Sequence, residues 1–160
     1  MAFSAEPSVI TDELIREGYR YWRLKCGEHS LPRRADLDPS EIKPILPHVL
    51  LIDVLGPSRY RYRLIGTDCV TAHGVNAVGL TLDEALKDHE YRTHVISLYD
   101  QCVDERRPVY SESLFFAHDG HSAERHVKVL FMPLSDDGAT VNMVFVVQVI
   151  RFMVRPPRDN

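Results

Sequence analysis

The sequence predicts an α+β domain in which a five-stranded antiparallel sheet carries helices on one face and follows an N-terminal helix. Five segments have the apolar alternation of strands, and they occur as a group of two and then a group of three. The connections within each group are short, as antiparallel hairpins require. The strongest helical pattern lies between the groups. Elements segregated in this way pack as a sheet with helices against it.

The first element is a helix over residues 11–27, before the sheet. Thr11 can cap its N-terminus, and Gly27 can end it. Its apolar side is formed by Leu14, Ile15, Tyr21, Trp22 and Cys26. A short second helix follows, with Asp38 as its cap.

The strands and the long helix follow in a clear order. The predicted strands are residues 48–55, 59–66, 109–118, 125–134 and 141–150. Residues 67–87 are interrupted by glycines and predict one or two brief helices. Residues 88–107 form the best helix of the chain, because apolar residues recur there at three- and four-residue spacing and Pro108 lies just beyond.

The length and composition are those of one soluble globular domain. The chain has 160 residues, of which 44% are hydrophobic and 26% are charged. We divide it into an N-terminal helix over residues 1–28, a domain over residues 29–154 and a flexible tail over residues 155–160.

Charge and cysteine content favour a cytoplasmic protein. The net charge of −4 leaves no general basic field for nucleic acid. The three cysteines are odd in number and form no CxxC pair, which is typical of reduced thiols. No secretory signal is visible at the start, and the longest apolar run, residues 143–150, is too short to span a bilayer.

A family resemblance is carried by the segment LPRRADLDPSEIKPILPHVLLIDV and the following RYRLIGTD. Together they resemble the signature of a bacterial family of single-domain PAS proteins, the fifth PAS class. The resemblance runs from Trp22 to Leu82, and it departs from the family pattern at Leu80, where a basic residue is expected. It implies a five-stranded sheet cupping helices, a sensory or dimerising role without catalysis, and any ligand between sheet and helices.

The candidate ligand site is therefore the cup between the sheet and the long helix. The residues predicted to line it are Tyr62, Leu64, Val129, Phe131 and Phe145 from the strands, and Leu98, Tyr99 and Cys102 from the helix. Ordinary core packing explains the same residues, so a filled cup and a ligand site both remain open. The hydroxyl groups of Tyr62 and Tyr99 are informative, because a buried hydroxyl needs a partner and could orient a ligand.

The opposite face of the sheet is also predicted to be apolar. The residues assigned to this outer face are Leu130, Met132, Val144 and Val146. An apolar surface of this size needs a cover. The N-terminal helix can supply it through Leu14, Ile15, Tyr21 and Trp22, either within one chain or across the two-fold axis of a homodimer.

The cysteines and histidines give little support for a cofactor or a metal. A photosensor flavin needs a reactive cysteine in an Asn-Cys-Arg-Phe context, whereas Cys69 lies in TDCVTA. A haem needs an axial histidine, and His94 lies off the apolar stripe of the long helix. The remaining candidates for haem or zinc ligation are His73, His89, His118, His121 and His126, which form no clear ligand set. Flavin and haem are disfavoured, the cofactor stays unassigned, and we expect no metal.

The function predicted from these patterns is a non-enzymatic PAS sensory or regulatory module. We expect it to act by contact with a signalling protein, as a homodimer, and to be able to bind a small ligand in the cup. An output domain is not evident in the sequence, which favours action through a partner.

Two other functions are left open. One is a small enzyme on a similar α+β scaffold, acting on an apolar substrate by acid–base chemistry that pairs Tyr62 or a histidine with a carboxylate, for which Asp53 is the candidate. The other is nucleic-acid contact through Arg59, Arg61 and Arg63. Alternating arginines are also typical of the solvated face of a strand, so we expect no nucleic-acid partner.

Overall fold

The computed structural model describes residues 2–4, 8–28, 30–116 and 123–154. The strands are β1 (Ala2–Ser4), β2 (Val49–Gly56), β3 (Arg59–Ile65), β4 (Val109–Phe116), β5 (Ala123–Leu134) and β6 (Met143–Val154). The α-helices are α1 (Glu13–Lys25), α2 (Thr67–His73), α3 (Leu82–Ala85) and α4 (His89–Glu105). Three short 3₁₀ helices, η1 (Arg34–Asp36), η2 (Pro39–Glu41) and η3 (Leu46–His48), lie between α1 and β2.

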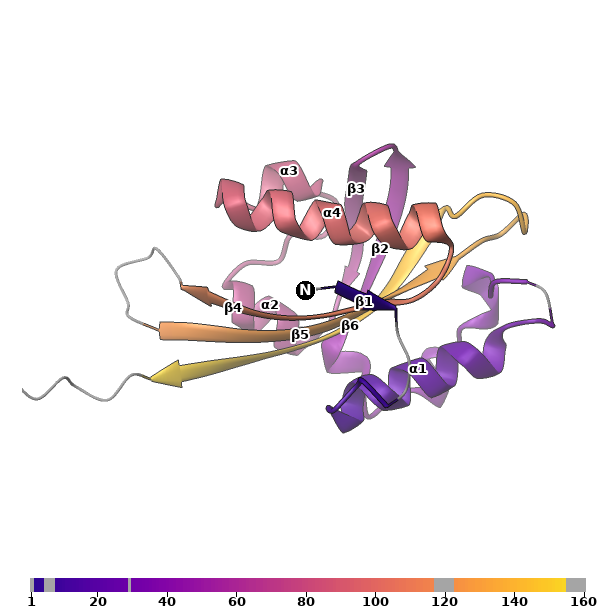
Figure 1. Cartoon of the computed structure of the whole chain (residues 1–160), viewed down its shortest axis with the longest axis horizontal. Helices are drawn as coiled ribbons and strands as arrows, with labels where there is room; N and C mark the ends of the chain where they lie inside the picture. Colours follow the sequence, from indigo (N-terminus) through magenta and orange to yellow (C-terminus); the bar gives the residue numbers. More distant parts are fainter. Residues whose placement is uncertain (1, 5–7, 29, 117–122, 155–160) are drawn as a thin grey trace, which may run out of the picture.

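The described strands form one antiparallel sheet in the order β1-β4-β5-β6-β2-β3 (Figure 1). The α+β class and the antiparallel sheet with helices are therefore confirmed. β1 extends the five predicted strands by a sixth, since Ala2 pairs with Ser111 and Ser4 pairs with Val109. A three-residue strand is too short to show an alternation pattern in the sequence.

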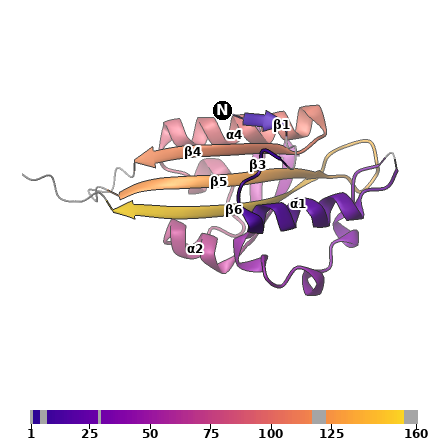
Figure 2. The same ribbon diagram turned by 60° about the horizontal axis from the view of Figure 1, so that its bottom comes forward.

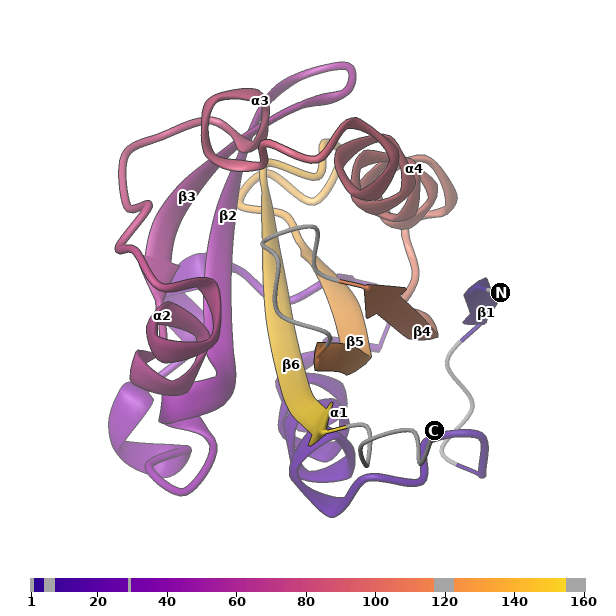
Figure 3. The same ribbon diagram turned by 90° about the vertical axis from the view of Figure 1, so that its left-hand side faces the viewer.

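The two faces of the sheet carry different helices (Figures 1 and 3). α4 packs on β4 and β5 over one face, which we call the α4 face. α1 packs on β5 and β6 over the opposite face, which we call the α1 face. α2 lies beside β6 and contacts it and η3 (Figure 2). The sheet is thus the middle layer between two sets of helices.

Each face has its own apolar core. The α1-face core includes Ile10, Ile15, Tyr21, Trp22, Val49, Leu51, Leu130, Met132, Phe145, Val147 and Val149. The α4-face core includes Leu50, Ile52, Tyr60, Tyr62, Cys69, Leu98, Tyr99, Cys102, Val129, Phe131, Val144 and Val146. The prediction that both faces are apolar agrees with these two cores.

The predicted orientation of β6 is wrong by one residue. Val146 pairs directly with Phe131, so both side chains lie on the α4 face. Val144 also lies there, although we expected Val144 and Val146 on the outer face. Phe145, expected in the cup, packs instead in the α1-face core. Since both faces of β6 are apolar, alternation alone cannot show which set faces which helix.

The predicted position of Leu64 is also wrong, because β3 contains a bulge. Leu51 pairs with Leu64, but the next residue, Ile52, pairs with Tyr62. Arg63 is therefore an extra residue, and it reverses the alternation between Tyr62 and Leu64. Leu64 lies opposite a residue of the α1-face core and is 37% exposed, so it does not line the cup.

α1 covers the outer face of the sheet within one chain. Asp12, rather than Thr11, caps the helix by accepting hydrogen bonds from the backbone of Leu14 and Ile15 at 2.9 and 3.3 Å. The Trp22 indole N–H donates to the carbonyl of Pro133 at 2.9 Å, which fixes the helix on the end of β5.

A glycine allows α1 to come this close. A Cβ added to Gly18 would lie 2.5 Å from Cγ2 of Val147, so the helix approaches β6 through a position where any side chain would force Val147 or the helix to move. Helix propensity alone disfavours glycine there. The close packing of α1 on β6 therefore explains why this position is a glycine.

Candidate functional site

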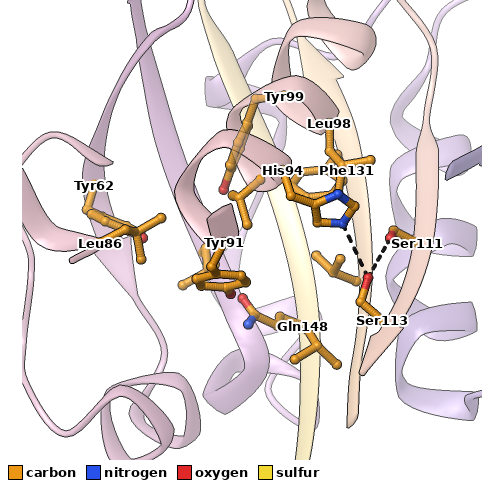
Figure 4. A pocket seen from close by; sticks show the side chains of 14 residues that line it. Tyr62, Leu86, Tyr91, His94, Leu98, Tyr99, Ser111, Ser113, Phe131 and Gln148 are labelled. Carbon is orange, nitrogen blue, oxygen red and sulfur yellow. Dashed lines mark hydrogen bonds between the residues drawn. The ribbon is translucent and has the colours of Figure 1, made fainter. Parts of the chain in front are cut away.

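A small cavity lies in the α4-face core, between α4 and the sheet (Figure 4). Its volume is about 30 Å³, which is enough for a water molecule. It is lined by Leu50, Tyr62, Leu86, Tyr91, His94, Val95, Leu98, Tyr99, Ser111, Ser113, Val127, Val129, Phe131 and Gln148. The predicted cup is therefore largely filled by its own side chains, and the remaining space is small and partly polar.

Three polar side chains at this cavity have unmet hydrogen-bonding capacity. Tyr62, Tyr99 and Gln148 are 7%, 2% and 6% exposed. Within the described parts of the chain, neither tyrosine hydroxyl nor the Gln148 amide has a hydrogen-bond partner. These polar atoms are not among the fully buried ones and retain some accessible surface, so water or a ligand can satisfy them.

The two tyrosines can act as hydrogen-bond donors. Burial raises the pKa of both Tyr62 and Tyr99 above the usual value for a phenol. Both hydroxyl groups therefore remain protonated at neutral pH, and each can donate one hydrogen bond while accepting others. The Gln148 amide adds two donors and one acceptor oxygen.

A second polar group at the cavity links α4 to β4. The Nε2 atom of His94 lies 3.3 Å from the Ser113 hydroxyl, which lies 3.3 Å from the Ser111 hydroxyl (Figure 4). Burial lowers the pKa of His94 below its usual value, so the imidazole is neutral at neutral pH. The prediction that His94 lies off the apolar stripe is wrong, because this side chain faces the cavity.

Aromatic contacts connect the cavity to the β2–β3 hairpin. The Tyr99 ring meets Phe131 edge-on at 4.6 Å and packs at 4.9 Å from the Tyr60 ring. The Tyr60 hydroxyl donates to Asp100 at 2.5 Å, and Ser58 donates to the same carboxylate at 2.7 Å. α4 is thus tied to the hairpin next to the cavity.

The predicted cup residues fall into two groups. Tyr62, Leu98, Tyr99, Val129 and Phe131 line the cavity. Cys102 is fully buried in the same core but does not line the cavity, and Leu64 and Phe145 lie elsewhere for the reasons given above. Contact of any of these residues with a ligand stays a prediction.

The predicted dimer residues make contacts within one chain. Ile15, Tyr21, Trp22, Leu130 and Met132 are buried in the α1-face core, with Leu14 packed against it. Because the face is covered by the chain's own helix, a homodimer formed through these side chains would require α1 to leave the sheet. The homodimer itself stays a prediction.

The polar cavity residues that sequence reasoning missed are Tyr91, His94, Ser111, Ser113 and Gln148. Two of them had a readable signal. His94 stands three residues after Tyr91 and four before Leu98, which places it on the same helix face. Gln148 is the single polar residue in the apolar run MVFVVQVI.

Tyr62, proposed for acid–base catalysis, lines the cavity, whereas Asp53 lies away from it, beside the arginines proposed for nucleic-acid contact. Asp53 follows Val49 and Leu51 on the α1 face. Its carboxylate pairs with Arg61 and Arg63, each at 3.2 Å. Asp53 therefore does not supply a carboxylate to the cup, and two of the three alternating arginines are engaged in ion pairs.

The residues around the cavity do not fit a flavin or a haem. Either group is far larger than about 30 Å³ and would displace α4 from the sheet. Cys69 and Cys102 are buried in the neighbouring core, and none of the residues that line the cavity is a cysteine. Within the described residues, no three His, Cys, Asp or Glu side chains come together as a metal site, and His118 and His121 lie outside those residues.

No helix in the described part of the chain is long and apolar enough to cross a membrane.

A family model described as "PAS domain" matches residues 11–147, a range that includes α1. No curated protein matches the sequence. Among solved structures, an RNA-binding Light-Oxygen-Voltage receptor is 17% identical with a TM-score of 0.45, over 74% of this chain and 35% of the receptor. A variant of the fungal photoreceptor VVD is 14% identical with a TM-score of 0.45, over 63% of this chain and 74% of its own. The chain thus spans about a third of the length of the RNA-binding receptor.

Proposed function

Since this chain belongs to the PAS domain family, we propose that it is a non-enzymatic sensory module that binds a small uncharged ligand in the cup between α4 and the sheet. The observation that carries this proposal is the set of unpaired polar groups on Tyr62, Tyr99 and Gln148. A ligand that accepts from the tyrosines and pairs with the amide would satisfy all three.

The chemistry of the cavity favours an uncharged ligand. None of the residues that line it is Asp, Glu, Lys or Arg, and burial keeps His94 neutral. A charged ligand would leave water without a counterion, which is costly in an apolar core. The lining holds His94 and tyrosine hydroxyls but no carboxylate to orient the imidazole, and the role proposed here is without catalysis.

Ligand binding must move α4 side chains, because the cavity is only about 30 Å³. Tyr99 contributes both a free hydroxyl and a ring that packs on Tyr60. Its displacement would disturb Tyr60 and the hydrogen bond to Asp100, which ties the hairpin to α4. We infer that this shift is the signal, passed by contact to a partner protein or to a second copy of the chain in the cytoplasm.

Native mass spectrometry of freshly purified protein tests the ligand. We expect a small molecule on the wild type and its loss from the double variant Tyr62→Phe, Tyr99→Phe. The matched control is Tyr110→Phe, because Tyr110 is equally buried but on the α1 face, where its hydroxyl donates to Glu112 at 2.7 Å. If the wild type carries no ligand and small uncharged fragments cause no NMR shifts at the cavity, the ligand proposal is wrong. A monomeric mass at micromolar concentration would contradict the homodimer.

A further inference from the structure

A second hollow lies beyond Gln148, between α2 and β6. This groove has a volume of about 210 Å³ and is separate from the cavity. It is lined by His48, Asp68, Cys69, Thr71, Ala72, Gln148, Ile150 and Phe152. α2 supplies one wall and β6 the other, and the two elements lie side by side (Figures 2 and 3).

Gln148 is the residue that the groove and the cavity share. Its side chain is 6% exposed, and within the described residues its amide has no hydrogen-bond partner. An amide presents a donor and an acceptor side by side, so its natural complement is another group with the same pair. A buried, unpaired amide at the end of an open groove indicates that this group is available to a ligand entering from outside.

The walls of the groove are part polar and part apolar, and the apolar part includes Ile150 and Phe152. Phe152 is 50% exposed although it is a large aromatic residue, and Ile150 is partly buried beside it. The Arg125 guanidinium lies 5.3 Å from the centroid of the Phe152 ring. The ionisable groups among the lining residues, His48 and Asp68, contact each other at 3.2 Å.

We propose that this groove is a binding site for a small uncharged aromatic amide, with the ring against Ile150 and Phe152 and the amide paired with Gln148. The volume is suitable, because a cavity of about 150 Å³ accepts benzene and the groove adds room for one substituent. The site goes beyond the ligand proposed for the cup, since the groove lining does not include Tyr62 or Tyr99. The two sites share the Gln148 amide, so a ligand in one competes with a ligand in the other for this group.

The thiol of Cys69 can be used to detect a ligand in the groove. Cys69 is 2% exposed and belongs to the wall of the groove, so a ligand there shields its thiol. Burial raises the pKa of Cys69 to about 12, and alkylation is therefore slow and best followed at alkaline pH. Cys26 lies at the end of α1, on the opposite face of the sheet, and serves as the internal control.

The experiment measures the alkylation rates of Cys69 and Cys26 by iodoacetamide, with benzamide as the probe. At a benzamide concentration of about ten times its Kd, we expect the rate at Cys69 to fall about tenfold and the rate at Cys26 to stay unchanged. Benzoate and toluene are the matched control probes, because one replaces the amide by a charge and the other removes it. Equal protection by all three probes, or no protection by benzamide, would overturn the proposal.

Two variants separate the groove from the cup. Gln148→Leu keeps the size of the side chain and removes the amide, so benzamide protection should fall at least tenfold while protection by toluene is kept. Tyr99→Phe alters the cup alone and should leave benzamide protection as in the wild type. If Tyr99→Phe abolishes protection and Gln148→Leu does not, benzamide binds in the cup, and the groove proposal is wrong while the cup proposal stands. If Gln148→Leu does not fold, the three probes on the wild type still decide the question.

Discussion

The substitution Tyr99→Phe tests whether the cavity hydroxyl is unpaired in the ligand-free protein. It removes one oxygen atom from a side chain that is 2% exposed and leaves the ring contacts with Phe131 and Tyr60 in place. A fully buried, unpaired hydroxyl costs about 1–3 kcal/mol, and this one retains some accessible surface, so its removal should raise the free energy of unfolding by about 1 kcal/mol. For a domain of this size, each 1 kcal/mol shifts Tm by about 2–4 °C. The variant should therefore be more stable and bind the cup ligand less tightly.

Urea unfolding of ligand-free protein at neutral pH measures this change. Tyr110→Phe is the control, because the same atom is removed from a hydroxyl that donates to Glu112 at 2.7 Å. That variant should lose about 1 kcal/mol, as expected for a paired hydroxyl. If Tyr99→Phe destabilises the protein as much as Tyr110→Phe does, the Tyr99 hydroxyl is satisfied in the ligand-free state, and the reasoning from an unpaired group fails.

Three further predictions concern the surrounding structure. Gly18→Ala should destabilise the protein by about 1–3 kcal/mol in urea unfolding, despite the better helix propensity of alanine, because the new Cβ would lie 2.5 Å from Val147; an unchanged midpoint would contradict the close packing of α1 on β6. Asp100→Asn should cost about 1–3 kcal/mol in thermal unfolding, since the carboxylate accepts from Tyr60 at 2.5 Å. Burial lowers the pKa of His94 in the folded state, so the unfolded state binds more protons between that value and about 6.5, and stability should fall as pH drops through this window. His94→Gln should flatten this part of the stability–pH curve, and an unchanged curve would show that another group is responsible.

The fold was predictable because turn residues and hydrophobic periods mark most of its elements independently. The predicted first hairpin corresponds to β2 and β3, and residues 88–107 contain the whole of α4. What could not be predicted was the orientation of particular strands. Alternation gives two sets of residues but does not say which set faces which helix when both are apolar. The bulge at Arg63 is invisible for a similar reason, because one extra residue leaves the local pattern unchanged.

The candidate site was predictable only in part. The residues that were missed depend on strand register or on side-chain polarity. Tyr62 and Tyr99 were found because a tyrosine on an apolar face carries a hydroxyl that needs a hydrogen-bond partner, whichever face of the sheet it lies on. Gln148 was missed because its position depends on the register of β6, in which it pairs with Val129 of the α4 face. His94 was missed because polarity was weighed above its spacing from Tyr91 and Leu98.

The position of Gln148 also explains why this register is strongly determined. Successive residues of β6 alternate between the two cores, so Val147 lies beneath Gly18 while Gln148 faces the cavity and the groove. A slip of one residue would place the amide under α1, where even a methyl group on Gly18 has no room. It would also move that amide away from the cavity and the groove, where water or a ligand can reach it, into an apolar core that offers neither. Both faces of β6 are otherwise apolar, so Gln148 determines which face points to α4. It does so because its amide lies at the cavity and the groove, where the two proposed ligands would bind.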